Sequence, residues 1–398
     1  MEGSPLTLFA RDATGKRCNP NRGRACRVSM TPTRCALRTP ASLSLLLALA
    51  SSGATAVQTP APASVVVRLG GYEGPAAEVF SRVEALEIDV AAGLLYVLDG
   101  GAHELRAFGL DGVHRWSFGA EGDGPGEFRY PVGLARRESG SIWVIDPEAQ
   151  RATVVDAAGR LSATRTLPSG IALSPWPGRF DAAGRLYSYR EADATAYGIE
   201  MVRYGEDLRP DNVLSPPPAP RDEEFYEGRD KRGSHLRARV PFTPRVVWRL
   251  DSAGRFVWGW TGDPRIFVSE GSRPRELASF DATAPPVTRA DRETALESLA
   301  RFEELGGRVD AARIPDRMPA FHTFVLGEDD GVWVVPTAQP EESATRILRL
   351  ETSGSPGRAV DLPFRLAAVP IPVVRRNYLL GLARDDRGIE EVFLVRLP

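Results

Sequence analysis

One short strand-like pattern recurs six times along this chain of 398 residues and constrains its fold more than any other feature. Five copies begin with glycine, and all are rich in β-branched, aromatic or aliphatic residues. The copies are GLLYVLD (93–99), GSIWVID (140–146), GRLYSYR (184–190), GRFVWGW (254–260), GVWVVP (331–336) and NYLLGLA (377–383). Their central residues are separated by 47, 44, 71, 75 and 47 positions. Four strands with tight turns take about 40–50 residues, so the pattern predicts a six-bladed, all-β propeller.

The two long intervals contain insertions, at 214–244 and at 284–320. The second insertion holds the one helix that we expect, at about 288–305. Thr288 with Asp291 three residues later is a capping pattern at its start, and Gly306-Gly307 is a stop signal. If about 25–30 residues are subtracted from each long interval, the remaining length is that of one blade.

The last repeat is one strand short, and the N-terminal strand at about 65–70 supplies the missing one. Residues 65–83 contain a strand and the segment that follows it, and they match residues 114–132. The two stretches share a glycine, a Gly-Pro pair, a glutamate and a valine at corresponding positions. In the second copy this segment is the outermost strand of a blade followed by the crossing to the next blade. We therefore expect residues 65–70 to complete blade six and close the ring, which removes open sheet edges.

These motifs resemble a known repeat family. The stretches GDGPGEF (122–128), YPVGLA (130–135) and GSIWVID (140–146) resemble an NHL repeat, best over about 119–160 with a weaker copy at 70–112. The body is similar to secreted bacterial six-bladed propellers of the NHL/TolB-like group. Because that group hosts several activities, the resemblance implies architecture more than function.

The start of the chain has the features of an export signal. From Met30, which this pattern favours as the true start, Arg34 and Arg38 precede a mostly apolar stretch at 41–50, and Ala54-Thr55-Ala56 is a small-x-small cleavage site. We expect residues 1–56 to be a leader with a signal peptide cleaved after Ala56, and 57–398 to be the propeller. The apolar stretch is too short to span a bilayer. This predicts a periplasmic or extracellular protein without an integral membrane span, the alternative being a disordered leader.

Charge and cysteine content narrow the partners and chemistry. Residues 1–56 carry eight basic and two acidic side chains, which leaves 42 basic and 50 acidic ones from Val57 onward. An acidic body argues against nucleic acid as a partner, because phosphate backbones need a positive surface. The three cysteines, at 18, 26 and 35, all precede the body, which excludes disulfides and thiol nucleophiles there.

The glycine-rich stretch 119–135 is a connector between blades and not a phosphate loop. Pro125 removes an amide donor, three acidic residues would repel an anion, and no helix follows the glycines. Neither a serine nucleophile motif nor a HExxH motif occurs in the sequence. We therefore assign no catalytic residue, no metal ligand and no cofactor, although a divalent metal in the central channel stays possible.

Candidate binding residues come from the first insertion and from the inner strands. The first insertion alternates basic, acidic and aromatic residues and is either a binding loop or a disordered one. Trp176, Trp248 and His322 fall on first strands, nearest the channel. The candidates are Tyr226, Arg229, Arg232, His235, Trp176, Trp248 and His322.

Together these observations predict an exported, monomeric propeller that binds a ligand or an envelope protein through the channel mouth and the insertions. No catalytic set is recognisable, which favours a protein that is not an enzyme. The alternative is a metal-dependent, lactonase-like hydrolase or lyase with His322 and inner-strand acids as ligands in the channel. A structural scaffold in a surface assembly is a third possibility.

Overall fold

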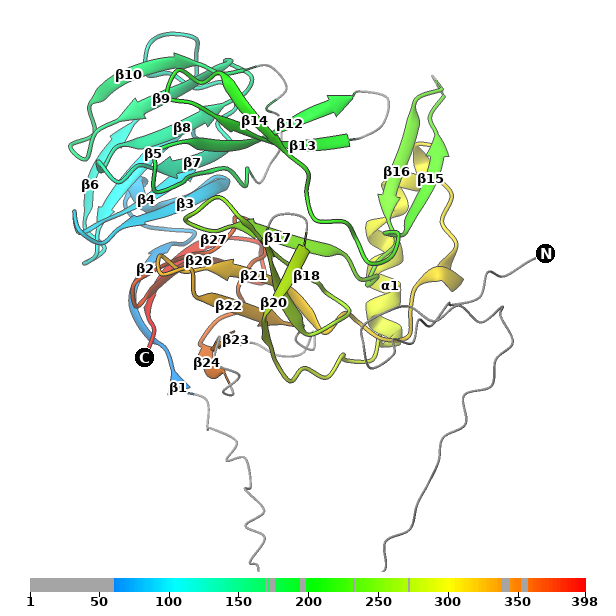
Figure 1. Ribbon diagram of the computed structural model, residues 1–398. Helices are drawn as coiled ribbons and strands as arrows, with labels where there is room; N and C mark the ends of the chain where they lie inside the picture. Colours follow the sequence, from blue (N-terminus) through cyan, green and yellow to red (C-terminus); the bar gives the residue numbers. More distant parts are fainter. Residues whose placement is uncertain are drawn as a thin grey trace, which may run out of the picture. The chain divides into compact units, whose positions relative to one another are not determined.

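The computed structural model describes residues 61–168, 171, 176–193, 198–231, 233–270, 273–337, 344–351 and 357–398, all within the unit Val57–Pro398. The predicted leader at 1–56 lies outside the described residues. The described chain is a six-bladed β-propeller, as predicted (Figure 1).

Each blade is a sheet of four antiparallel strands in which sequence neighbours pair. Blade one comprises β3 (Val83–Asp89), β4 (Leu94–Asp99), β5 (Glu104–Gly109) and β6 (His114–Phe118). Blade two comprises β7 (Gly133–Arg136), β8 (Ile142–Asp146), β9 (Arg151–Val155) and β10 (Leu161–Thr166). Blade three comprises β11 (Arg179–Phe180), β12 (Leu186–Asp193), β13 (Gly198–Tyr204) and β14 (Pro210–Leu214).

The second half of the ring repeats this plan. Blade four comprises β17 (Val246–Leu250), β18 (Phe256–Trp260), β19 (Arg265–Glu270) and β20 (Arg273–Ser279). Blade five comprises β21 (Phe321–Leu326), β22 (Val332–Pro336), β23 (Thr345–Arg349) and β24 (Arg358–Leu362), with β1 (Ala61–Pro62) added in parallel to β24. Blade six comprises β25 (Val373–Arg375), β26 (Tyr378–Arg384), β27 (Glu390–Arg396) and β2 (Ser64–Gly70).

The inner and middle strands are apolar on both faces because each blade packs between two others. In β4, five consecutive residues from Leu95 to Asp99 are buried, whereas in the outer strand β6 exposed and partly buried residues alternate. Continuous apolar runs are the pattern of strands covered on both faces. This is why the six copies of the sequence pattern, which mark the second strands, are so easily recognised.

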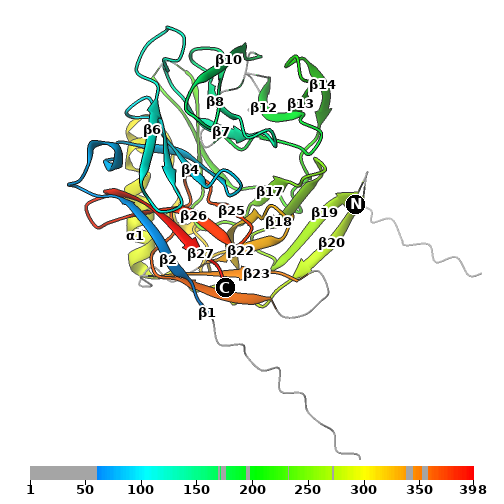
Figure 2. The same cartoon turned by 90° about the vertical axis from the view of Figure 1, so that its left-hand side faces the viewer.

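The N-terminal strand closes the ring, as the sequence predicts. β2 pairs antiparallel with β27, with Val67 opposite Leu394 and Leu69 opposite Val392 (Figure 2). Val67 and Leu69 are buried in one hydrophobic cluster that also contains side chains of blades one and six. The two ends of the propeller sequence therefore meet in a single blade, and its packing against blade one joins them to the start of the ring.

Buried aspartates fix the crossings between blades. Asp99 is fully buried, and its carboxylate accepts hydrogen bonds from the amides of Ser81 and Arg82 at 2.9 and 3.0 Å. Asp146 does the same for the amides of Arg129 and Tyr130 at 2.7 and 3.1 Å. The stretch 119–135 thus runs from β6 to β7 as a connector, and these aspartates cap turns rather than bind a ligand.

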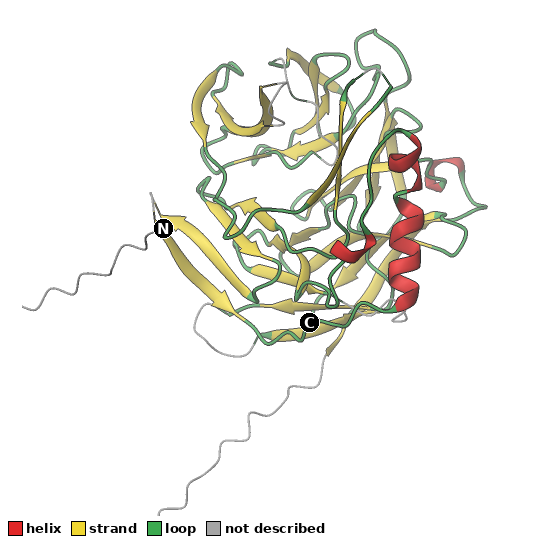
Figure 3. Cartoon of the chain, turned by 90° about the vertical axis from the view of Figure 1, so that its right-hand side faces the viewer, coloured by secondary structure: helices red, strands yellow, loops and turns green. Residues whose placement is uncertain are grey.

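The two insertions fold together beside the ring. The first forms a hairpin of β15 (Phe225–Arg229) and β16 (His235–Arg239), so its described residues are ordered. The second is helical in α1 (Arg289–Ser298) and α2 (Ala300–Glu304), begins at the predicted Thr288–Asp291 capping box, and continues to a short 3₁₀ turn at Ala311–Arg313. We call residues 215–245 and 280–320 together the cap; Figures 1 and 3 show its hairpin and helices side by side.

Candidate functional site

Two cavities lie along the inner strands of the propeller. The first, which we call the channel cavity, has a volume of about 250 Å³. All six innermost strands contribute to its lining, namely β3, β7, β11, β17, β21 and β25. Convergence of every blade on one cavity is what a propeller axis provides, so this cavity occupies the central channel.

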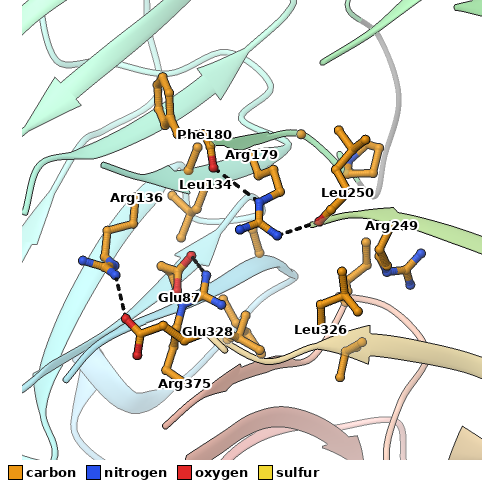
Figure 4. Close-up of a pocket in the computed structure, with 18 of the residues that line it drawn as sticks. Glu87, Leu134, Arg136, Arg179, Phe180, Arg249, Leu250, Leu326, Glu328 and Arg375 are labelled. Atoms are coloured by element: carbon orange, nitrogen blue, oxygen red, sulfur yellow. Dashed lines mark hydrogen bonds and ion pairs between the residues drawn. The ribbon is translucent and has the colours of Figure 1, made fainter. Parts of the chain in front are cut away.

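The channel cavity has a charged lining in which arginines and carboxylates are mixed (Figure 4). The five carboxylates of the lining are Glu84, Glu87, Glu138, Asp181 and Glu328. Nη2 of Arg375 lies 2.9 Å from Oε2 of Glu87, and Arg136 makes longer contacts of 3.7 Å with Asp89 and 3.5 Å with Glu328. The four arginines of the lining are Arg136, Arg179, Arg249 and Arg375.

Two of these arginines have no carboxylate partner within ion-pair distance among the described residues. Arg179 donates to the carbonyl oxygens of Leu250 and Phe180 at 2.6 and 3.3 Å. Arg249 donates to Trp248 O and to the hydroxyl of Thr323, and its buried Nε atom has no hydrogen-bond partner. Burial lowers the pKa of Arg249 to about 10, because a desolvated guanidinium holds its charge less readily.

The second cavity, which we call the cap cavity, has a volume of about 880 Å³ and lies between the cap and the propeller. The cap contributes Phe242, Arg245 and residues of α1, while β21, β22 and the segment before β25 form the propeller side. Both insertions precede innermost strands, β17 and β21, so they reach the same face of the ring. The volume falls in the usual range of small-molecule pockets, about 300–1,000 Å³.

Buried contacts between hairpin and helices hold the cap side of this cavity. Tyr226 is only 1% exposed, packs in a cluster with Val240 and Leu299, and donates its hydroxyl proton to the carbonyl oxygen of Asp310 at 2.8 Å. Arg313 donates to the carbonyl oxygen of Phe225 at 2.9 Å. These contacts join the first insertion to the second, so each insertion stabilises the conformation of the other.

The charged lining of the cap cavity is mostly positive. It includes four arginines and one carboxylate, and the lining residues are Arg239, Arg245, Arg365, Arg384 and Asp291. Asp291 accepts from the amide and hydroxyl of Thr288 in the helix cap, and Arg239 and Arg384 pair with Glu223 and Glu390 at 2.8 and 2.5 Å.

Arg245 lines the cap cavity without a close counter-charge among the described residues. Among the described residues no carboxylate lies within 4 Å of it, and its Nη2 atom makes only a long contact of 3.5 Å with the carbonyl oxygen of His322. Burial and the neighbouring Arg239 lower its pKa, and Glu223 offsets this only in part. Buried positive charge without a paired carboxylate favours an anionic ligand.

His322 lies at the start of β21 and lines the cap cavity beside Arg245. The residue is exposed to solvent, yet desolvation by the surrounding protein, and then the charge of Arg245, lower its pKa below the ordinary value of 6.5, so the imidazole is neutral at pH 7. Within the described residues, no group of three His, Cys, Asp or Glu side chains is placed to hold a metal. The inner-strand acids Glu84 and Glu87 line the channel cavity, so they do not converge with His322.

The other predicted site residues are distributed over the molecule. Trp176 lines the channel cavity and donates its indole proton to Ser188 Oγ at 2.8 Å, while Trp248 packs edge-on against Tyr189 and Phe256. Tyr226 is buried inside the cap. In the hairpin, Arg229 donates to Gly233 O at 3.1 Å and is opposite His235, and Arg232 lies outside the described residues. Their roles in binding stay predictions.

Sequence reasoning missed the arginines. Arg136, Arg249 and Arg375 each occupy the innermost strand of a blade, and Arg245 immediately precedes one. The sequence patterns that predict the candidate sites are those of histidine, tryptophan and carboxylate residues, in which arginine has no part. The sequence signal for these arginines is their location on or next to an innermost strand. The repeat identifies the innermost strands, and an arginine there lies near the central channel or its opening.

No protein-family model and no curated protein matches this sequence. Solved structures with a similar fold include a Bacteroides fragilis protein provisionally described as exported (TM-score 0.49, 12% identity, covering 83% of this chain and 94% of that one). Virginiamycin B lyase from Staphylococcus aureus (0.42, 11%, 80% and 95%) and the calcium-binding protein regucalcin from Agrobacterium tumefaciens (0.39, 15%, 85% and 96%) are also similar. At these identities the similarity concerns fold alone. The NHL and TolB-like assignment stays a prediction.

No helix in the described part of the chain has the length and apolar composition that a bilayer crossing requires.

Proposed function

We propose that this chain is an exported, non-enzymatic binding protein whose ligand is a small organic anion held in the cap cavity. The observation that carries the proposal is Arg245, a partly buried arginine without a carboxylate partner among the described residues, in a cavity of about 880 Å³. A bound carboxylate or phosphate ester would supply the missing counter-charge through charge-assisted hydrogen bonds.

The remainder of the cap cavity suits an anion with an apolar part. Phe242, Met318, Val335 and Leu366 contribute apolar surface on the cap and propeller sides. Threonine hydroxyls add neutral donors, and the buried hydroxyl of Thr337 has no hydrogen-bond partner among the described residues. Predominantly apolar walls with a few fixed polar groups are typical of ligand pockets.

Phe242 has a backbone conformation that supports a binding role. Its φ angle is +60°, in the left-handed region that bulky side chains rarely adopt. Such strain costs about 1–3 kcal/mol and is concentrated at functional sites. In this cavity it places an aromatic side chain in the lining opposite the propeller.

Calorimetric titration of the full chain with paired ligands tests the proposal. The pairs are benzoate with benzamide, hexanoate with hexanamide, and phenyl phosphate with phenol, so that each anion has a neutral counterpart of similar shape. At least one anion is expected to bind and its counterpart to bind far more weakly. Arg245→Met is expected to reduce the affinity by about tenfold to a hundredfold, the effect of losing a hydrogen bond to a charged group.

Arg289→Met is the matched control, because Arg289 lies on α1 outside the cavity lining, is 91% exposed and pairs with Glu293 on the surface. Its affinity is expected to equal that of the wild type. Equal binding of anions and neutral counterparts, or equal affinity in the Arg245 variant, would contradict the proposal. The metal-dependent alternative predicts instead a stoichiometric divalent ion in the purified protein and turnover of a lactone.

A further inference from the structure

The channel cavity contains an arginine, Arg179, that has no carboxylate partner within ion-pair distance among the described residues, and this arginine is separate from the cap cavity. Nε and Nη1 of Arg179 donate to backbone carbonyls, while its Nη2 atom has no partner among the described residues. Desolvation lowers the pKa of Arg179, and the charge of Arg375 lowers it further. The charge of Arg375, from another blade, therefore acts on Arg179, and Asp330, Glu87 and Asp251 offset it in part.

The carboxylates nearby do not neutralise Arg179. The carboxylates whose charge acts on Arg179 are Asp330, Glu87 and Asp251, and each has a nearer partner. Asp330 accepts from the amide and hydroxyl of Ser252, Glu87 pairs with Arg375 at 2.9 Å, and Asp251 pairs with Arg255 at 2.7 Å. Arg136 adds positive charge on the same lining, since its contacts with Asp89 and Glu328 are long and its buried Nε atom has no hydrogen-bond partner in the part of the chain that the structure describes. Figure 4 shows Arg179, Arg375 and Arg136 around the space between their blades.

The volume of the channel cavity limits what it can hold. At about 30 Å³ per molecule, 250 Å³ accommodates about eight waters, which is room for a small oxyanion with its hydration but not for a drug-sized ligand. Guanidinium groups match the planar or tetrahedral oxygens of carboxylate, phosphate and sulfate in a bidentate manner.

We propose that the channel cavity is a structural oxyanion site, in which an anion such as inorganic phosphate bridges Arg179 of blade three and Arg375 of blade six. The anion would supply a counter-charge that the two arginines share. Because it binds the folded ring alone, it would stabilise the folded state by mass action. This site is independent of ligand binding in the cap cavity.

Thermal unfolding of the full chain in increasing inorganic phosphate, with chloride replaced to keep ionic strength constant, tests the site. The melting temperature of the wild type is expected to rise with phosphate. Arg179→Met is expected to weaken phosphate binding at least about tenfold, the usual effect of losing a charge-assisted hydrogen bond. Arg203→Met is the control, since Arg203 belongs to the same blade, pairs with Asp211 and does not line the cavity.

A second variant gives a change of opposite sign. Glu87→Gln removes the carboxylate that competes for Arg375, so the affinity for phosphate is expected to increase by about tenfold or more. Glu87→Gln tests the proposed site even if Arg179→Met fails to fold. Weaker or unchanged phosphate binding in Glu87→Gln would overturn the proposal.

The cap-cavity variant separates this site from the proposed function. If Arg245→Met keeps the phosphate response and Arg179→Met loses it, the oxyanion lies in the channel. If Arg245→Met loses the response and Arg179→Met keeps it, phosphate binds in the cap cavity and the channel site is refuted. An undiminished response in both variants, or none in the wild type, would also refute it.

Discussion

Arg245 and His322 meet at the mouth of the propeller, where Nη2 of Arg245 lies 3.5 Å from the carbonyl oxygen of His322. Arg245 immediately precedes β17, and His322 is the second residue of β21. Each residue follows one of the two insertions, so the position of their contact depends on both insertions and on two blades. This contact places an arginine without a carboxylate partner, among the described residues, beside a neutral imidazole.

The first prediction concerns pH and His322. Desolvation and Arg245 hold the pKa of His322 below 6.5 in the folded protein without ligand, and a bound anion is expected to raise it. Anion affinity should therefore increase as pH falls from about 7 to 5, with proton uptake on binding. The charged groups that face this cavity are Arg239, Arg245, Asp291, Arg365 and Arg384.

The lowered pKa of His322 also determines the direction in which the stability of the folded protein changes with pH. The unfolded chain binds the proton at about pH 6.5 and the folded chain only at lower pH, so this contribution to stability is complete above pH 6.5 and is lost as pH falls below it. His322→Gln should flatten both the affinity profile and this part of the stability profile, measured by calorimetry and chemical denaturation. Unchanged profiles in the variant would contradict the prediction.

A second prediction separates strain from binding at Phe242. Phe242→Gly removes a side chain from a position with φ of +60°, where glycine is unstrained, so the melting temperature should not fall. Anion affinity should fall, because the variant loses part of the apolar wall. A clear loss of stability with unchanged affinity would show that Phe242 serves the fold instead.

The buried aspartate of the first crossing provides a third prediction. Asp99→Ala removes the acceptor of four backbone amides and the carboxylate that lies 3.4 Å from Nη2 of Arg106. We expect a loss of about 3–5 kcal/mol in the free energy of unfolding, measured in urea. Asp207→Ala is the control, because Asp207 is mostly exposed and pairs with Arg209 on the surface, and it should cost less than about 1 kcal/mol.

A fourth prediction tests ring closure by the N-terminal strand. Leu69 is buried between blades six and one, so Leu69→Ala should destabilise the fold by about 2–5 kcal/mol. Val65 lies on the same strand but is 44% exposed, and Val65→Ala should change stability by less than about 1 kcal/mol. Equal effects of the two substitutions would indicate that the strand does not seal the ring core.

The regular spacing of the second strand of each blade was sufficient to predict the six blades. These strands are buried on both faces, so they appear in the sequence as continuous apolar runs. Ring closure was predictable for a related reason, since the crossing after β2 repeats the crossing after β6. The helix start at Thr288 was readable because a capping box is local chemistry. Its division near Leu299 was not predicted, and the sequence pattern indicated one continuous helix.

The candidate sites were much less predictable. The expected binding residues belong to different parts of the fold, and of the six that the structure describes only His322 lines the cap cavity. Arg179, Arg245 and Arg375 come from separate blades, and no spacing in the sequence relates them. Arg179 and Arg245 lack a carboxylate partner within ion-pair distance among the described residues, whereas Arg375 pairs with Glu87, and these differences depend on packing between blades.

The most direct test of the cap cavity as the ligand site is a crystal structure with 4-bromobenzoate, using the anomalous signal of bromine to locate it. The account predicts a bromine peak inside the cap cavity, with the carboxylate within hydrogen-bond distance of the Arg245 guanidinium. Bromine peaks only outside that cavity, at a concentration that saturates the protein in solution, would contradict it.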